Sequence, residues 1–247
     1  MDFTLEKYAQ LLVSLKESGI GFQLRHDVDL LPHNSLRVAQ IENGLGLTAT
    51  YYFRTVPESY DELVIKEIAH LHHDIGYHYE SLTTCNGNVD AAYDDFRKNL
   101  DKLRALAPVH SICMHGSPKS KWDSKDIWKR YDYRELGIMH EPYFDTDFSK
   151  TLYLTDTGRR WDGFHVSVRD KIPEYHDKWE AEGLSFHTTD DIIGQLQDER
   201  SSLMRSGYSL LITTHPQRWN PFGVRYVKEA CLQSVKNVVK HFIVMHG

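Results

Sequence analysis

The sequence has few cysteines, no long apolar run and no excess of basic residues. Its three cysteines are odd in number and far apart, which fits a reducing compartment better than a disulfide framework. No run approaches the roughly 18 apolar residues of a membrane span, and the first residues lack the basic and apolar regions of a signal peptide. We therefore expect a cytoplasmic protein with no membrane span.

The balance of charge argues against nucleic acid as the main partner. Lys and Arg number 29 against 35 for Asp and Glu, which gives a formal net charge of -6, and the basic residues form no block. A hydrophobic share of 40% is ordinary for a globular protein with a sizeable core. The chain also lacks repeats, low-complexity tracts and linkers, so we expect one domain over residues 1–247.

Apolar runs and helical periodicities alternate along the first half of the chain. The expected strands span 22–29, 48–55, 75–80 and 111–115, and the expected helices span 4–18, 59–72 and 90–106. A further helix would be capped by Asn34 and ended by Gly44 and Gly46. This alternation predicts βαβ units and a parallel sheet or barrel, in which the chemistry lies at the carboxyl ends of the strands.

The second half of the chain is less regular. The expected helices span 124–136, 174–183 and 223–241, and the expected strands span 137–143, 152–154 and 208–213. One more helix would be capped by Thr189.

Polar side chains stand where the expected strands end. Asp27 and Asp29 close the first strand, and residues two apart in a strand point to the same side, roughly 7 Å apart. Carboxylates this close repel unless a cation lies between them, and a divalent metal ion or an arginine would serve. A solvated acidic turn is the alternative. Arg54 and Glu80 end later strands, and this repeated position indicates an active site.

Fifteen histidines are present, and several end apolar strands. His78 and His115 stand beside Gly76 and Gly116, whose small size would leave room for a site. We expect both histidines to bind a metal, because one carboxylate and two histidines form a common catalytic set; a hydrogen-bonded core histidine is the alternative. His215 is a further ligand or a general acid, since imidazole titrates near neutral pH.

Three motifs, in this order, resemble those of the polysaccharide deacetylase superfamily, which includes carbohydrate esterase family four. The matching segments are Arg25-His26-Asp27-Val28-Asp29, Asp74-Ile75-Gly76-Tyr77-His78 and Leu211-Ile212-Thr213-Thr214-His215-Pro216. Their combination is similar to the branch associated with surface-polysaccharide and O-antigen biosynthesis. The resemblance implies an irregular (β/α) barrel with about seven mostly parallel strands.

The resemblance also implies a role for each matching residue. Asp27 would be the general base, and Asp29 would bind the metal. His78 would be a second ligand, and His215 would be the general acid that protonates the leaving amine.

The chain departs from the family where a second histidine ligand is expected. Leu82 stands at that position. We therefore expect His115, at the end of the next strand, to replace the missing ligand, with Glu80 as the alternative.

A charged turn at 156–161 loosely resembles another motif of the family. Asp156 would orient His215, and Trp161 would wall the acyl pocket. The expected substrate-binding residues are Arg25, Glu80, Arg160, Trp161 and Trp219. The aromatic members either stack on sugar rings or belong to the core, and both alternatives stay open.

These features predict a metal-dependent hydrolase that removes an N-acyl group, first of all N-acetyl, from an amino sugar in polysaccharide or O-antigen precursor metabolism. The cofactor would be one divalent ion, with zinc expected first and nickel, cobalt or iron as alternatives. The substrate would be a small molecule or a glycan, and the oligomeric state is left open. The rival functions are hydrolysis of another C–N bond (formamide, cyclic imide or ureide) and a non-catalytic, metal-containing glycan-binding domain.

Overall fold

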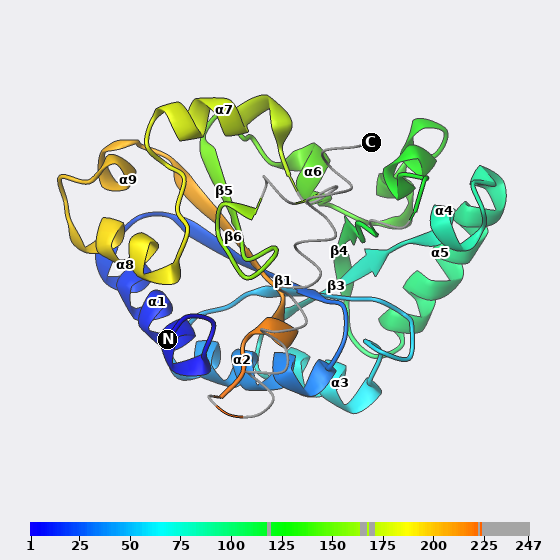
Figure 1. Ribbon diagram of the computed structural model, residues 1–247. Helices are drawn as coiled ribbons and strands as arrows, with labels where there is room; N and C mark the ends of the chain where they lie inside the picture. The colour runs from blue at the N-terminus through cyan, green and yellow to red at the C-terminus, as the bar shows by residue number, and fades with distance from the viewer. Residues whose placement is uncertain (118–119, 164–166, 168–170, 222, 224–247) are drawn as a thin grey trace. The chain divides into compact units, whose positions relative to one another are not determined.

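Strands and helices alternate along the computed structural model, which describes residues 1–117, 120–163, 167, 171–221 and 223 (Figure 1). The strands are β1 (Phe22–Val28), β2 (Thr50–Phe53), β3 (Asp74–Tyr79), β4 (Val109–Met114), β5 (Thr151–Thr155) and β6 (Ser209–Thr214). Their order is β4-β3-β2-β1-β6-β5, and the pairs β2–β3, β3–β4 and β5–β6 are parallel. The predicted α/β class with mostly parallel strands is confirmed. The described residues form six strands in an open sheet, with β4 and β5 at its two edges.

The chain divides into two compact units. Among the described residues, unit 1 contains Met1–Arg25, Gly44–Leu47 and those from Asp147 onward, and unit 2 contains His26–Asn43 and those from Thr48 to Thr146. Strand β1 supplies residues to both units. One domain over the whole chain stays a prediction.

Unit 2 holds β2, β3, β4 and the end of β1. Its helices are α2 (Pro32–Gly44), α3 (Glu62–His70), α4 (Ser81–Thr84), α5 (Val89–Arg104), α6 (Pro142–Asp145) and the 3-10 helices η1 (Ser124–Lys129) and η2 (Tyr133–Leu136). Tyr77 and Tyr79 of β3 pack on Phe96 of α5, with ring centroids 5.1 and 5.4 Å from that of Phe96. Because successive strand residues face opposite sides, His78 points away from this packed face.

Tyr52 of β2 fills the space beside Gly76 of β3. A Cβ atom at Gly76 would lie 2.5 Å from Cε1 of Tyr52, so no larger residue fits without moving the ring. The Tyr52 hydroxyl hydrogen-bonds to Ser111 of β4. Gly76 therefore makes room for a core tyrosine, and the prediction that it leaves room for a ligand is wrong.

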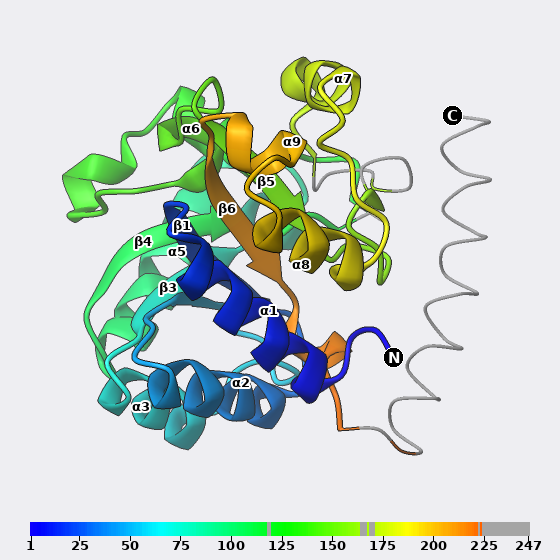
Figure 2. The ribbon, with the colours of Figure 1, turned by 90° about the vertical axis from the view of Figure 1, so that its left-hand side faces the viewer.

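Unit 1 holds β5, β6 and the start of β1. Its helices are α1 (Leu5–Ser18), α7 (Pro173–Ala181), α8 (Thr189–Gln197), α9 (Ser202–Arg205) and the 3-10 helix η4 (Pro216–Arg218). Thr4 caps α1 by accepting a hydrogen bond from the backbone nitrogen of Lys7, and Gly19 ends the helix at a φ of 70°. Helices α1 and α8 lie side by side (Figure 2).

Two predicted caps are wrong by a few residues. Helix α2 begins at Pro32, so Asn34 lies inside it; proline suits the first turn because its missing N–H would have no partner there. Helix α8 is capped by Thr188 rather than Thr189, and Asp191 completes a capping box with it.

The region 124–143 differs most from its prediction. The expected long helix is the two short 3-10 helices η1 and η2, each begun by its own aspartate cap, Asp123 or Asp132. In place of the expected strand at 137–143, the structure has one isolated bridge between Ser111 and His140, followed by α6. The expected helix at 223–241 lies outside the described residues. None of the described helices combines the length and apolarity needed to cross a membrane.

Candidate metal centre and buried histidine–aspartate pair

In unit 2, three predicted metal ligands meet at the strand ends. Asp29 follows β1, His78 lies in β3, and His115 follows β4. One donor atom from each lies within 4.8 Å of the others. The Nε2 atoms of His78 and His115 lie 3.5 and 3.4 Å from Oδ1 of Asp29.

These spacings fit a small divalent ion. Four ligands placed tetrahedrally at about 2.0–2.1 Å from zinc are about 3.3–3.4 Å from one another. The donor pairs measured here, at 3.5 and 3.4 Å, are close to that edge length. Three protein donors also leave a fourth position for water or substrate, as in catalytic zinc sites. The residues present therefore fit a divalent metal ion.

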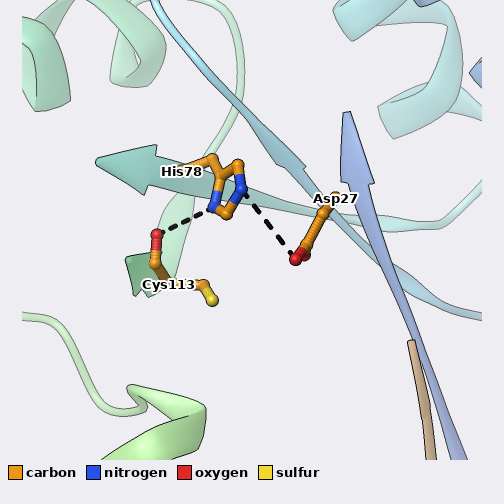
Figure 3. A group of neighbouring side chains, drawn as sticks. All are labelled: Asp27, His78 and Cys113. Carbon is orange, nitrogen blue, oxygen red and sulfur yellow. Dashed lines mark hydrogen bonds and ion pairs between the residues drawn. The ribbon is translucent and has the colours of Figure 1, made fainter. Parts of the chain in front are cut away.

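The orientation of His78 is fixed by the main chain. Its Nδ1 lies 3.0 Å from the carbonyl oxygen of Cys113, which can only accept, so Nδ1 carries the proton (Figure 3). Its Nε2 lone pair then faces the acidic side chains, with Oδ2 of Asp27 at 3.9 Å. Asp27 is itself buried.

The orientation of His115 is set by a side chain instead. Its Nδ1 lies 3.0 Å from Oε2 of Glu80, while Arg54 donates to Oε1 through Nε at 2.9 Å and Nη2 at 2.7 Å. Burial alone would raise the pKa of Glu80, but the hydrogen bond from His115 and the charge of Arg54 lower it to about 2. The ionised carboxylate accepts, so Nδ1 of His115 donates and Nε2 is free to bind a metal.

A second possible donor group, which the sequence analysis missed, shares His78. It consists of Asp27, His78 and Cys113, all buried, from strands β1, β3 and β4 (Figure 3). The β3–β4 register pairs His78 with Cys113. The signal in the sequence was the spacing of Cys113, two residues before His115, which places both on one face of the strand.

In unit 1, Asp156 and His215 form a buried pair. Nδ1 of His215 lies 2.7 Å from Oδ1 of Asp156, and the backbone nitrogen of His215 donates to Oδ2 at 3.0 Å. Strands β5 and β6 are neighbours, and these residues directly follow them. This contact fixes the orientation of the imidazole ring.

Arg218 and Trp219 complete the surroundings of Asp156. Arg218 donates through Nη1 to Oδ1 at 2.5 Å, and the Trp219 indole donates to Oδ2 at 2.8 Å. Nη1 of Arg218 also lies 2.7 Å from Nδ1 of His215; guanidinium can only donate, so both nitrogens share the Asp156 oxygen. Burial alone would raise the pKa of Asp156, but Arg218 and His215 hold it below its ordinary value of 3.8. The sequence analysis missed Arg218.

The predicted substrate-binding residues have other partners. Arg160 binds Asp162 through Nε at 2.5 Å and Nη2 at 2.6 Å. Trp161 and Trp219 are 3% and 1% exposed, which favours the core alternative over stacking on sugar. Arg25 is also buried. Of the five residues expected to bind substrate, Glu80 is the one that contacts a member of the candidate donor group, His115.

No protein-family model and no curated protein matches the sequence. Five solved chains are similar, and three of them are proteins of Bacillus species. BA3943 of Bacillus anthracis, a CE4 family pseudoenzyme, is 13% identical over 89% of this chain and 61% of its own, with a TM-score of 0.44. The peptidoglycan deacetylase PdaC of Bacillus subtilis, in a mutant form, is 10% identical over 92% of this chain and 98% of its own, with a TM-score of 0.40.

The third structure is PdaA of Bacillus subtilis, a family 4 carbohydrate esterase. It is 12% identical over 92% of this chain and 83% of its own, with a TM-score of 0.41. The present chain covers 61% of the length of BA3943, which is less than two thirds of it. BA3943 and PdaA are both described as members of CE4 or carbohydrate esterase family 4, the family that the three sequence motifs resemble.

Proposed function

We propose that the chain is a metal-dependent hydrolase that removes an N-acyl group from an amino sugar, as a divergent polysaccharide deacetylase. The observation that supports this most is the position of Asp29 Oδ1, 3.5 and 3.4 Å from Nε2 of His78 and His115, with Asp27 beside them. A divalent ion held by Asp29, His78 and His115 would polarise the acyl oxygen and make a bound water more acidic.

Asp27 is the general base in this proposal. Its Oδ2 lies 3.9 Å from Nε2 of His78, beyond a hydrogen bond, so the carboxylate is near the donors without belonging to the Asp29 set. A carboxylate at this position would take the proton of the attacking water.

His215 is the general acid in this proposal. When both ring nitrogens carry protons, Nδ1 donates to Asp156 and Nε2 delivers its proton to the leaving amine. Asp156 stabilises the charged ring and fixes the orientation of the imidazole, because it is ionised and buried.

The substrate in this proposal is an N-acetylated amino sugar of polysaccharide or O-antigen precursor metabolism, acted on in the cytoplasm. Zinc is the first choice of metal, since carboxylate and imidazole donors suit it; nickel, cobalt and iron share this preference. The two donor groups would prefer different metals. A thiolate of Cys113, in the group with Asp27 and His78, would select softer ions than Asp29 and His115 would.

The first test is metal content, measured by elemental analysis on wild type, His115→Ala and Cys113→Ser after loading with zinc. The proposal expects about one equivalent in wild type and in Cys113→Ser, and little in His115→Ala. Loss of zinc from Cys113→Ser alone would place the ion in the other donor group and contradict the proposed ligands.

The second test is amide hydrolysis, measured as release of free amine from N-acetylated sugar nucleotides. We expect turnover by wild type and a loss of roughly 10²–10⁴-fold in Asp27→Asn. A chain that binds zinc but releases no amine from any N-acyl sugar would instead be the non-catalytic glycan-binding domain.

A further inference from the structure

Arg54 and Glu80 connect the ends of four neighbouring strands in unit 2. Arg54, after β2, donates through Nη1 to the main-chain oxygen of Asp29 at 3.2 Å and through Nε and Nη2 to Glu80. Glu80, after β3, reaches His115 after β4 at 3.0 Å. The β3–β4 register pairs Tyr79 with Met114, so Glu80 and His115 are opposite one another at the next position.

We propose that Arg54 and Glu80 are positioning residues for the metal: they hold His115 and the main chain of Asp29 so that both donors face one point. This inference rests on the proposed metal site. It assigns Glu80 an indirect role, in which its effect on the metal passes through His115.

The contacts of Glu80 favour this indirect role over direct ligation. Oε1 already accepts two N–H groups of Arg54, and Oε2 accepts from His115. A bond from Glu80 to the ion would compete with the interaction that turns Nε2 of His115 toward Asp29. The hydrogen bond also makes the imidazole a more basic donor, as carboxylate partners of metal-bound histidines do.

Arg54 is itself held at a fixed place. Its backbone nitrogen donates to Ser59 Oγ at 3.1 Å, and that hydroxyl donates to the carbonyl oxygen of Val28 at 2.5 Å. The Arg54 side chain is 19% exposed, so its guanidinium has little contact with water. The arginine guanidinium suits these contacts because its several N–H donors are held in one rigid plane. A lysine has a single ammonium group and cannot donate to both Glu80 and Asp29 in the same geometry.

The test is metal affinity rather than activity. Cobalt binding is followed by visible absorption, and zinc affinity by competition with a chromophoric chelator. The proteins are wild type, Glu80→Ala, Glu80→Gln, His115→Ala and the double variant Glu80→Ala/His115→Ala. We expect Glu80→Ala to weaken binding about 10–100-fold, and Glu80→Gln, which keeps an acceptor oxygen, to weaken it less.

The double variant separates positioning from direct ligation. If Glu80 acts through His115, then Glu80→Ala should have no further effect on affinity once His115 is alanine. A further loss as large as that in the wild-type background would overturn the inference, and so would an affinity of Glu80→Ala equal to wild type. Arg54→Lys should weaken cobalt binding and broaden its absorption bands, and wild-type behaviour of this variant would also count against the inference.

Two controls keep these outcomes interpretable. Asp126→Asn removes an exposed carboxylate of the same unit, paired with Lys129 at 2.7 Å, and should leave metal affinity unchanged. Thermal unfolding of the metal-free variants shows whether each one folds, and Glu80→Gln serves if Glu80→Ala does not. Wild type that binds neither metal would sink the proposed function, whereas normal binding by every Glu80 and Arg54 variant would sink this inference alone.

Discussion

Arg218 holds Asp156 within a buried turn, donating through Nη1 to Oδ1 at 2.5 Å and to the main-chain oxygen at 3.0 Å. The side chains are 10% and 0% exposed, so water contributes little to either. Removing the cation would leave a buried carboxylate with one fewer partner. We predict that Arg218→Met lowers the free energy of unfolding by about 3–5 kcal/mol, measured with urea.

An exposed ion pair in the other unit supplies the control. Arg130 and Asp90 are 3.1 Å apart with side chains 63% and 56% exposed. We expect Arg130→Met to change the free energy of unfolding by at most about 1 kcal/mol. Equal losses in the two variants would show that burial of the Asp156 pair has no energetic consequence.

The lowered pKa of Asp156 predicts a loss of stability in acid. Arg218 and His215 favour the ionised form in the folded state, so the folded pKa lies below the ordinary 3.8. The stabilising contribution is complete above that ordinary value and is lost as pH falls through the folded pKa. The difference in unfolding free energy between wild type and Asp156→Asn should therefore shrink between about pH 5 and pH 2. A constant difference over this range would contradict the assignment.

Metal binding and proton transfer should separate by mutation. His215 is not a member of either donor group among the described residues. We predict that His215→Gln keeps its zinc, measured by elemental analysis, and loses roughly 10²–10⁴-fold in amide turnover. Loss of both properties together would mean that His215 is a ligand, the alternative left open by the sequence.

The contact between Gly76 and Tyr52 predicts a strong response to one methyl group. A Cβ atom at Gly76 would lie 2.5 Å from Tyr52 Cε1, so we expect Gly76→Ala to lower the unfolding free energy by about 1–3 kcal/mol. Gly44→Ala is the matched control, because nothing lies within 4 Å of its added Cβ. Tyr52→Leu should recover part of the loss; a purely backbone effect would not respond to it.

The sequence predicts which polar residues lie at strand ends, because each of them directly follows an apolar run that reads as a strand. Asp29, His78 and His115 each stand where an apolar run stops, and parallel strands bring such points to the same edge. The pairing of Asp156 with His215 followed only from the family resemblance, and both residues directly follow their strands.

The contacts that depend on register and turn shape could not be predicted. Cys113 lies beside His78 because β3 and β4 pair in one register among several that the apolar pattern allows. The Arg218 side chain lies beside His215 because η4 is a 3-10 turn, in which residues three apart stand above one another. The sequence left open whether Trp161 and Trp219 stack on sugar rings or pack in the core, because hydrophobic periodicity does not distinguish an exposed ring from a buried one.

The two histidines of the metal cluster differ in how easily they can be changed. His78 is anchored to a main-chain oxygen of Cys113, which every amino acid provides, so no single substitution at 113 removes the acceptor. His115 is anchored to the side chain of Glu80, which one codon change can replace. In the proposed metal site, a change of metal preference would therefore begin at residues 80 and 115, while His78 would provide the constant point of attachment.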